Sequence, residues 1–315
     1  MVELAVTIGK LELANPVMPA SGTFAEGLGK VIELDRLGAL VTKTIMREHR
    51  VGNPTPRVAE TTDGMLNSIG IPSKGVPHFI ENTLPLYARH SVPLVVSISA
   101  PTAEGFASLA AEISRQEIAA IEANISCPNL EEDGQAFAMT PGSTEAVVRK
   151  LRDATELPLW VKLTPNTGDI AGVAVAAESA GADALVVANT VLAMSIDVNP
   201  FRPSLGNIMG GLSGPAIKPL ILRLVYQCAR AIDIPIIGCG GIMNTEDAVE
   251  YLLAGASAVQ VGTANFIHPT AMVTIIEGMN QFCERHDLRK VAELVGAVDI
   301  EEFDEGELDW VDPSS

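Results

Sequence analysis

The sequence predicts a single α/β domain, residues 1–315, with the architecture of a (β/α)8 TIM barrel. Eight short apolar runs recur along the chain, and helical patterns separate them. The runs are apolar throughout rather than alternating, which is typical of strands that are covered on both faces. Strands that alternate with helices pair in parallel through right-handed crossovers, and eight such units close a barrel. An open, doubly wound sheet is the alternative fold class.

The expected strands and helices follow one another in the order that such a barrel requires. The apolar runs are NPVMPASG (15–22), ALVTKT (39–44), PLVVSISA (93–100), AIEANISCP (120–128), PLWVKLTP (158–165), ALVVANT (184–190), IPIIGCGG (234–241) and AVQVGTA (258–264). Helices are expected at 103–116, 143–154, 170–180, 216–232, 245–254 and 270–286. Residues of about 1–15 are expected to form a hairpin around Gly9 that closes the barrel floor, and the acidic residues of about 300–315 a solvated tail.

Two strand-to-helix connections are longer than the usual few residues. They are 46–75, after the second expected strand, and 191–215, after the sixth. Catalytic groups of such barrels collect at the carboxyl ends of the strands, where these two connections also lie. We therefore expect the long loops after strands 2 and 6 to shape an active site.

Composition argues against several classes of protein. The formal net charge is −18, from 39 acidic and 21 basic residues, so the chain would repel nucleic acid and anionic membrane surfaces. The four cysteines have no CxxC spacing and the five histidines form no HExxH motif, so we expect neither a metal site nor an iron–sulfur cluster in this chain. There is no signal peptide or membrane-spanning run, which predicts a cytoplasmic protein.

Polar side chains and glycines gather where the expected strands end. These residues are Ser21, Lys43, Ser97, Asn124, Cys127, Lys162, Asn189, Thr190, Gly240, Gly241, Gly262 and Thr263. Lys43 and Lys162 are two of only eight lysines in the chain. A buried ammonium is costly unless an anion or an acceptor-rich ligand meets it, so both lysines are candidates for ligand binding. The alternative is that each ammonium reaches solvent or pairs with a nearby acid.

The last two expected strands end in GCGG and VGTA, which favours a phosphate site. Glycines let backbone N–H groups approach a phosphate closely, and the N-terminus of the following helix adds partial positive charge. Neither GxGxxG after the first strand nor GxxxxGK[ST] occurs, so a mononucleotide is expected rather than a dinucleotide or a P-loop ligand. The alternative is that these glycines only permit tight turns.

Cys127 lies among hydrogen-bonding residues in NISCPN (124–129), unlike a cysteine of a hydrophobic core. A thiol in such a polar setting can accept a proton, so Cys127 is the candidate base. The alternative is a loop thiol without a role. Cys239 lies within the predicted phosphate turn, where its small size alone could explain it, whereas Cys228 and Cys283 are expected in helix cores.

A series of motifs extends from residue 15 to residue 266. In chain order they are ASGTF, NPTPRVAET, GMLNSIG, NISCPN, GQAF, VKLTPN, ANT, GGLSGPAIKP, IPIIGCGGI and AGASAVQVGTANF. Together they resemble the motifs of class 1 dihydroorotate dehydrogenase, specifically the class 1B catalytic, FMN-binding subunit. The resemblance implies a barrel that holds one FMN per chain at its carboxyl end and oxidises (S)-dihydroorotate to orotate in pyrimidine (UMP) biosynthesis.

The resemblance also implies roles for individual residues. Cys127 would remove the proton from carbon 5 of dihydroorotate while hydride leaves carbon 6, and Lys162 would stabilise negative charge on the reduced flavin. The residues implied in substrate binding are Lys43, Asn67, Ser68, Ile69, Gly70, Ile71, Asn124, Asn189 and Thr190. Those implied in FMN binding are Ser21, Lys43, Thr44, Ser97, Asn124, Lys162, Ala188, Gly214, Gly240, Gly241, Gly262 and Thr263.

The chain departs from the family pattern at two places in this set. Ser97 stands where family members commonly have Asn, which shortens a contact to flavin or substrate. Ile71, Pro72 and Ser73 follow the glycine of the substrate loop in place of the usual LQN, which changes fine contacts to the substrate.

The class 1B resemblance implies a second protein that carries FAD and a [2Fe-2S] cluster and passes electrons to NAD. This chain has neither a dinucleotide fingerprint nor a cysteine cluster, so a reduced FMN would have no internal route onward. The expected assembly is a heterotetramer, in which a core homodimer is flanked by two partner subunits. The alternatives are a class 1A enzyme that hands electrons to fumarate, a flavoenzyme like dihydropyrimidine dehydrogenase, and a non-redox phosphate-binding barrel.

Overall fold

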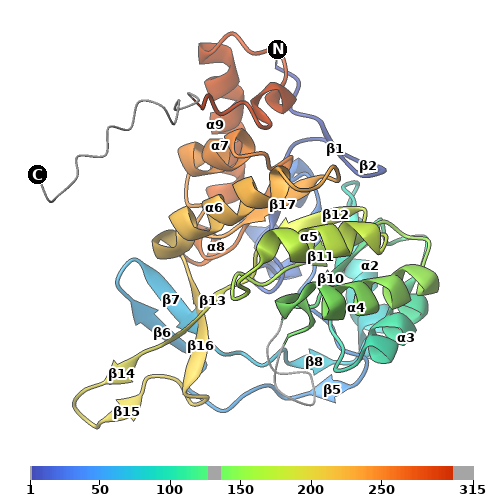
Figure 1. The fold of residues 1–315 in the computed structure, drawn as a ribbon, viewed down its shortest axis with the longest axis vertical. Helices are drawn as coiled ribbons and strands as arrows, with labels where there is room; N and C mark the ends of the chain where they lie inside the picture. Colours follow the sequence, from blue (N-terminus) through green and yellow to red (C-terminus); the bar gives the residue numbers. More distant parts are fainter. Residues whose placement is uncertain (1, 127–135, 301–315) are drawn as a thin grey trace, which may run out of the picture.

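A computed structural model describes residues 2–126 and 136–300, and its centre is an eight-stranded parallel sheet (Figure 1). The strands are β3 (Val17–Pro19), β4 (Leu40–Val41), β9 (Leu94–Ile98), β10 (Ala120–Asn124), β11 (Leu159–Lys162), β12 (Ala184–Val187), β17 (Ile236–Cys239) and β18 (Ala258–Val261). Their order in the sheet is β3-β18-β17-β12-β11-β10-β9-β4, so each strand lies beside the next barrel strand along the chain. This order confirms the predicted barrel, because the order in a doubly wound sheet reverses partway.

Backbone contacts at the seam between β3 and β4 close this sheet. The Gly38 N–H donates to the Val17 carbonyl at 2.8 Å. The buried Asn15 side chain donates to the Arg36 carbonyl at 2.9 Å and accepts from the Val17 N–H at 3.1 Å. A Cβ at position 38 would overlap the Asn15 carbonyl oxygen, so only glycine permits this close approach.

Helices alternate with the strands in the predicted order. The main ones are α3 (Ala103–Ile113), α4 (Pro141–Ala154), α5 (Ile170–Ser179), α6 (Lys218–Ala229), α7 (Thr245–Leu253) and α9 (Ala271–Arg285). The side chains of Thr102, Thr140, Asp169 and Asn244 cap the N-termini of α3, α4, α5 and α7. Within residues 2–126 and 136–300, no helix is long and apolar enough to cross a membrane.

Short helical segments complete the units. They are η1 (Glu26–Lys30), η2 (Leu34–Arg36), α1 (Val76–His78), η3 (Phe79–Thr83), α2 (Leu84–Tyr87), η4 (Phe137–Met139), η5 (Pro215–Ile217), α8 (Ala264–Ile267) and η6 (Val291–Leu294). The helical stretch 76–87 is not predicted from the sequence, because Pro77 and Pro85 interrupt the helical pattern there.

The barrel strands are buried along their full lengths, as expected for parallel strands that are covered on both faces. Trp160 and Tyr251 are the largest of the fully buried side chains. Cys228 on α6 and Cys283 on α9 are also buried, which confirms their predicted place in helix cores.

The N-terminal segment contains a hairpin, in which β1 (Val6–Ile8) pairs antiparallel with β2 (Leu11–Leu13). Gly9 makes the turn with a φ of +62°, and its Cβ position lies 3.1 Å from the carbonyl oxygen of Asp183, just before β12 begins. Ile8 and Leu13 are buried. The hairpin turn therefore packs against the amino end of β12, on the side where the floor is expected.

The two long loops pair with each other to form one antiparallel sheet. The first loop supplies β6 (Val58–Thr61) and β7 (Gly64–Asn67), and the second supplies β13 (Val191–Met194) and β16 (Met209–Ser213). The order of this sheet is β13-β16-β7-β6, so β16 joins the second loop to β7 of the first. Two smaller pairs are β5 (His49–Arg50) with β8 (Ser73–Lys74), and β14 (Ile196–Asp197) with β15 (Arg202–Pro203).

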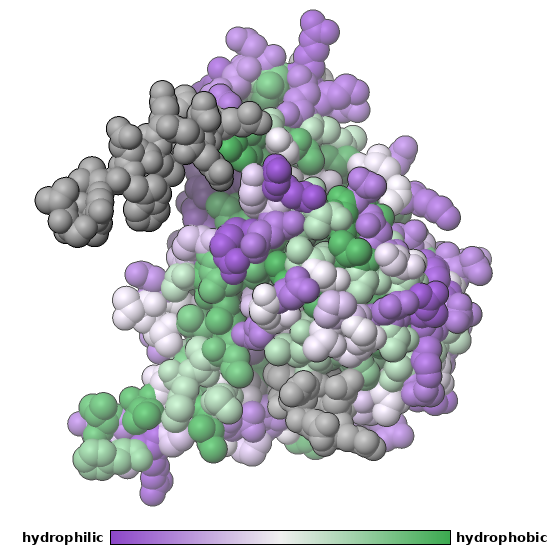
Figure 2. All heavy atoms as spheres, viewed as in Figure 1, coloured by the Kyte–Doolittle hydropathy of each residue, from purple (hydrophilic) through white to green (hydrophobic). Residues whose placement is uncertain are grey.

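The second loop projects from the barrel as an arm, residues 191–213, with the β14–β15 hairpin at its end (Figure 1). The exposed apolar side chains of the arm are Leu192, Met194, Ile196, Val198, Phe201, Ile208 and Met209. Phe201 is 88% exposed. Figure 2 shows apolar residues gathered over this projection. An exposed apolar surface of this kind is typical of a contact with another protein.

The seam makes Gly38→Ala a test of barrel closure. The added methyl group would meet the Asn15 backbone rather than a flexible side chain, so we expect a loss of about 1–3 kcal/mol in the free energy of unfolding. The measurement is urea unfolding followed by circular dichroism. Gly142→Ala, on the exposed start of α4 where a Cβ meets nothing within 4 Å, is the matched control and should be neutral or stabilising. Equal stability of the two variants would contradict this account of the seam.

Candidate active site

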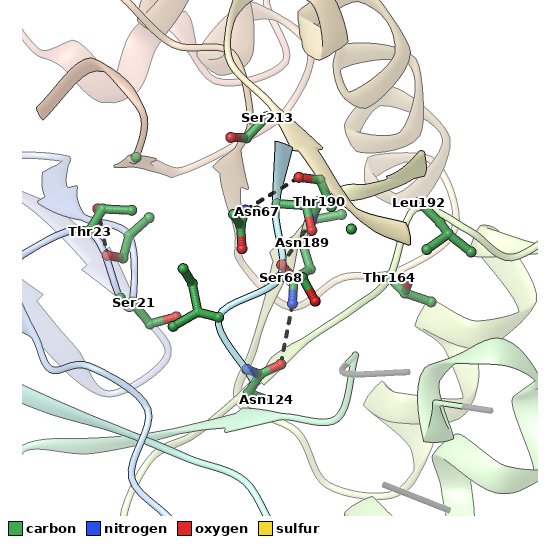
Figure 3. A pocket seen from close by; sticks show the side chains of 18 of the residues that line it. Ser21, Thr23, Asn67, Ser68, Asn124, Thr164, Asn189, Thr190, Leu192 and Ser213 are labelled. Atoms are coloured by element: carbon green, nitrogen blue, oxygen red, sulfur yellow. Dashed lines mark hydrogen bonds between the residues drawn. The ribbon is translucent and has the colours of Figure 1, made fainter. Parts of the chain in front are cut away.

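A cavity of about 700 Å³ lies at the carboxyl ends of the barrel strands. Residues of the strand ends form part of its wall, and residues of β7, β13 and β16 in the loop sheet form another part. In Figure 3, Ser21 and Thr23 lie on one side, and Thr164, Asn189 and Thr190 lie on the other. A cavity of this volume suits a ligand of cofactor size.

The cavity brings together most of the residues that were singled out from the sequence. The predicted residues that line it are Ser21, Lys43, Thr44, Asn67, Ser68, Ile69, Gly70, Ile71, Asn124, Lys162, Ala188, Asn189, Thr190, Gly240, Gly241, Gly262 and Thr263. Ser97 and Gly214 do not line it. Cys127, the candidate base, lies outside the described residues, as does the acidic tail from residue 301 onward.

Side-chain amides form a hydrogen-bonded cluster on one wall. The Asn189 amide donates to the Asn124 side-chain oxygen at 3.4 Å (Figure 3). It also donates to the Ser126 hydroxyl at 2.7 Å, and Ser126 donates to that same Asn124 oxygen at 2.7 Å. The Thr190 N–H donates to the Asn189 side-chain oxygen at 2.8 Å. These bonds determine where the NH₂ group and the oxygen of each side-chain amide lie. The cluster is therefore oriented before a ligand binds.

The predicted substrate loop, 67–71, is fastened by the segment before β6. The Arg50 side chain donates to the Gly70 carbonyl at 2.7 Å, and the Asn53 amide donates to the Ser68 hydroxyl at 2.8 Å. Gly70 and Ile71 both have positive φ, +76° and +45°. A β-branched residue such as Ile71 rarely adopts this conformation, so the surrounding contacts impose it.

Lys43 is a cation that faces the cavity without a carboxylate partner among the described residues. Its ammonium donates to the Pro72 carbonyl at 2.6 Å. Desolvation lowers the pKa of Lys43, although part of the side chain remains exposed on the cavity side. An ammonium in this position is suited to a ligand carboxylate, which would supply the missing counter-charge.

Lys162 is both paired with an acid and part of the cavity wall. Its ammonium donates to the Gln260 side-chain oxygen at 3.0 Å and lies 3.9 Å from a Glu122 carboxylate oxygen. Burial opposes its charge, but attraction to Cys239 when that thiol ionises and to Glu122 outweighs burial, so the pKa of Lys162 is raised. Burial also raises the pKa of Cys239. Near neutral pH, Cys239 is therefore neutral and Glu122 is the counter-charge.

The glycines at the ends of β17 and β18 differ in what they require. Gly241 has a φ of +72°, and its Cβ position lies 2.8 Å from the Lys218 backbone nitrogen, so the chain itself demands glycine there. A Cβ at Gly262 would meet only Ala20 and Thr23, at 3.6 and 3.7 Å. Packing would therefore tolerate a side chain at position 262. Because Gly262 has none, its backbone is exposed to the cavity.

The helix that follows β17 contributes less than expected to a phosphate site. Asn244 caps α7 by accepting the Asp247 N–H at 2.9 Å, and Asp247 accepts the Met243 N–H at 2.8 Å. The first turn of α7 already holds two acids, Glu246 and Asp247. Because these carboxylates satisfy the positive end of the helix, backbone N–H groups near the glycines are the better candidates.

Ser97 and Gly214 lie behind the wall. The Ser97 hydroxyl hydrogen-bonds to the Thr44 hydroxyl at 2.9 Å, and Ser97 is fully buried. A Cβ at Gly214 would come within 2.9 Å of the Gly64 backbone, and Gly214 has a φ of +99°. In this structure Ser97 supports Thr44, and Gly214 permits a turn beside β7.

Several lining residues were not singled out from the sequence. They are Thr23, Asn53, Met65, Met139, Thr164, Asn166, Leu192, Met209, Ser213 and Phe266, with others. Asn166 has a clear structural part: its amide donates to the Thr190 carbonyl at 3.2 Å and its oxygen accepts the Leu192 N–H at 2.8 Å. Its place at the end of VKLTPN, four residues after Lys162, was the available signal.

Within the described ranges, no group of three or more His, Cys, Asp or Glu side chains could hold a metal ion. The fold and the cavity define the chain as a (β/α)8-barrel protein with a candidate ligand site at the carboxyl ends of the strands. A family model described as dihydroorotate dehydrogenase matches residues 3–283, and the chain belongs to that family.

Curated relatives are similar to the chain over nearly its whole length, and the three described here are each named dihydroorotate dehydrogenase B (NAD(+)), catalytic subunit. The relative from Desulforamulus reducens is 49% identical over 300 residues, which cover 94% of this chain and 99% of the relative. The relative from Alkaliphilus metalliredigens is 46% identical over 299 residues, which cover 94% of this chain and 99% of the relative. The relative from Bacteroides fragilis is 46% identical over 303 residues, 95% and 100%. The family predicted from the motifs is confirmed.

Asn166→Ala tests how the start of β13 is held over the cavity. Loss of the bond from the Leu192 N–H should speed hydrogen exchange of that amide by about 2-fold to 10-fold, because a net hydrogen bond contributes about 0.5–1.5 kcal/mol. Exchange is read by mass spectrometry of the peptide that contains residue 192. Asn199→Ala, which removes only the bond from the Asn199 side-chain amide to Asp197 near the tip of the arm, is the control. Unchanged exchange at Leu192 in the Asn166 variant would refute this role.

Proposed function

We propose that this chain is the catalytic subunit of an NAD-linked dihydroorotate dehydrogenase, which oxidises (S)-dihydroorotate to orotate in pyrimidine biosynthesis. One observation carries the proposal: Lys43 and the cluster of Asn124, Asn189 and Thr190 line the same cavity as the glycine-rich ends of β17 and β18. An unpaired ammonium and oriented amides suit a ligand that has a carboxylate and ring amides. The names of the relatives support the same substrate.

FMN is the proposed cofactor, and the residues present fit it. The open backbone at Gly262, the turn at Gly240 and Gly241, and Thr263 beside them suit a phosphate group. Further residues that would hold FMN are Ser21, Lys43, Thr44, Asn124, Lys162 and Ala188, with Ser97 and Gly214 acting from behind the wall. When bound, FMN supplies a two-electron acceptor for the hydride that leaves carbon 6 of the substrate.

The chain's own residues would bind and orient the substrate. Lys43 would pair with its carboxylate, and Asn67, Asn124 and Asn189 would hydrogen-bond to its ring amides and carbonyl oxygens. The backbone of the loop 67–71 and the Thr190 side chain would complete this binding site. Because these groups are fastened to one another before binding, the reacting carbons would be held in one orientation.

Cys127 is proposed as the base that removes the proton from carbon 5. The proposal rests on NISCPN and on the position of this motif, which begins at Asn124, the last residue of β10. Asn124 and Ser126 belong to the amide cluster of the cavity. Lys162, which lies at the end of the neighbouring strand β11, would supply positive charge to the cavity.

A partner subunit is proposed for the onward transfer of electrons. The words "catalytic subunit" in the names of the relatives support a separate partner. We propose that this partner carries FAD and a [2Fe-2S] cluster, and that two copies flank a core homodimer of this chain, which is folded as a single domain with an acidic tail. The exposed apolar surface of the arm, residues 191–213, supports a contact with another protein chain.

The visible spectrum of the purified chain tests the proposed reaction. We expect noncovalent FMN and full bleaching of its absorption by anaerobic dihydroorotate. In Cys127→Ser the chain should keep FMN and bind orotate, but bleaching should slow by about 2 to 4 decades, the usual contribution of a general base. A colourless protein that cannot be reconstituted with FMN would exclude the proposed function. An unchanged rate in Cys127→Ser would remove this residue from the base role alone.

The electron acceptor separates the class 1B proposal from the class 1A alternative. The isolated chain is assayed with dihydroorotate and either fumarate or NAD, and the NAD assay is repeated with an added FAD and iron–sulfur subunit. We expect NAD-dependent turnover only with that partner. Fast fumarate-dependent turnover by the isolated chain, with no gain from the partner, would reject the class 1B proposal and leave the dihydroorotate chemistry standing.

A further inference from the structure

A chain of buried polar groups connects Glu122, Gln260 and Lys162 across the inside of the barrel. The Gln260 amide donates to one Glu122 oxygen at 2.6 Å, and its own oxygen accepts from the Lys162 ammonium at 3.0 Å. Glu122 and Gln260 are fully buried, and Lys162 is 3% exposed. The three side chains come from β10, β18 and β11, so barrel closure brings them together.

Glu122 determines the orientation of the Gln260 amide. A carboxylate accepts hydrogen bonds and an ammonium only donates them, so the NH₂ group of Gln260 must face Glu122 and its oxygen must face Lys162. The reverse orientation would set oxygen against carboxylate and NH₂ against ammonium. Because Glu122 fixes the Gln260 amide in this orientation, a hydrogen-bond acceptor always faces the Lys162 ammonium.

Glu122 also has a charge that only Lys162 compensates among the described residues. The second carboxylate oxygen of Glu122 has no hydrogen-bond partner there, and it is the atom that lies 3.9 Å from the Lys162 ammonium. A charge inside a barrel is costly unless an opposite charge accompanies it. Each of these two buried charges therefore compensates the other.

The ammonium of Lys162 is held from behind and on one side. Gln260 accepts one of its hydrogen bonds, and the Ser21 hydroxyl accepts another at 3.4 Å. Lys162 and Ser21 both line the cavity. Cys239, which also lines the cavity, is a further hydrogen-bond partner of this ammonium. The ammonium is thus held at the cavity wall.

We propose that Glu122 is a positioning residue that acts through Gln260 to hold Lys162 as a cation at the cavity, where it favours the binding of reduced over oxidised FMN. The inference rests on the proposed FMN site and adds two residues that no ligand would touch. Glu122 on β10 and Cys239 on β17 are the titratable groups that face Lys162 among the described residues. Because Cys239 is neutral near neutral pH, loss of Glu122 leaves the ammonium without a counter-charge.

Midpoint potentials of the bound flavin between pH 6 and 10 test this proposal. They are measured for the holoprotein, for Glu122→Gln, for Lys162→Met and for the double variant, each as a difference from the wild type, so that titration of the flavin itself cancels. Glu122→Gln should lower the pKa of Lys162, so that the preference for reduced FMN falls about tenfold as pH rises through that pKa. A tenfold loss is about 30 mV for a two-electron couple. Lys162→Met should show the loss at every pH, and Glu122→Gln should add nothing to it.

Asp183→Asn is the matched control, because Asp183 also belongs to a partly buried ion pair, with Arg152 at 2.8 Å, but lies at the start of β12 on the opposite end of the barrel. It should leave the potential unchanged. If Glu122→Gln does not fold, Gln260→Met is measured in its place. It removes an acceptor of the Lys162 ammonium but keeps the Glu122 charge, so it should show a pH-dependent loss of the same sign and smaller size.

Three results would overturn the proposal. One is a potential in Glu122→Gln, or in Gln260→Met, that equals the wild-type value at every pH. Another is an effect of Glu122→Gln that persists in the Lys162→Met background, which would mean that the carboxylate acts without the lysine. A wild-type chain that binds no FMN overturns the proposed function together with this inference, whereas a flavin-loaded chain with a silent Glu122 overturns the inference alone.

Discussion

The seam between β3 and β4 is the constraint on which the position of the site depends. Gly38 and Asn15 bring the first and second barrel strands into contact, so the carboxyl ends of all eight strands form one ring. In a closed ring of this kind, side chains that are far apart in the chain meet across a few ångströms, as Asn124 and Asn189 do at 3.4 Å. In an open sheet, Ser21 after β3 and Thr44 after β4 would lie at opposite edges instead of lining one cavity.

The loop sheet adds a second level of order to this ring. Because β16 pairs with β7, the loops after β4 and β12 cannot move independently, and the residues they carry over the cavity keep a fixed relation to the strand ends. A Cβ at Gly211 would overlap the side chain of Thr190, so the sheet approaches the amide cluster as closely as glycine allows. Asn166 fastens the start of β13 from the barrel side. The site is thus enclosed by backbone pairing as well as by side chains.

The sequence predicted the parts of the fold and site that depend on local pattern. Apolar runs predicted the barrel strands, and polar residues at their ends predicted that Lys43, Asn124, Lys162 and Asn189 would share one cavity. Pairing between the two long loops is non-local and leaves no periodic signal, so it was not predicted. Pro77 and Pro85 concealed a helical stretch. The sequence left two interpretations of Lys162 open, contact with a ligand or pairing with an acid. The structure is compatible with both, because Lys162 lines the cavity while its partner Glu122 does not. A glutamate within the apolar run AIEANI was the signal for that partner.

We propose that one cavity at the carboxyl ends of the strands holds dihydroorotate with its carboxylate toward Lys43 and its ring among the asparagines. A crystal structure of the chain with FMN and the product orotate tests this claim most directly. We expect the orotate carboxylate to lie within hydrogen-bond distance of the Lys43 ammonium, and Asn67, Asn124 and Asn189 to contact the ring. Orotate bound outside this cavity, or bound within it with the carboxylate turned away from Lys43, would contradict the account.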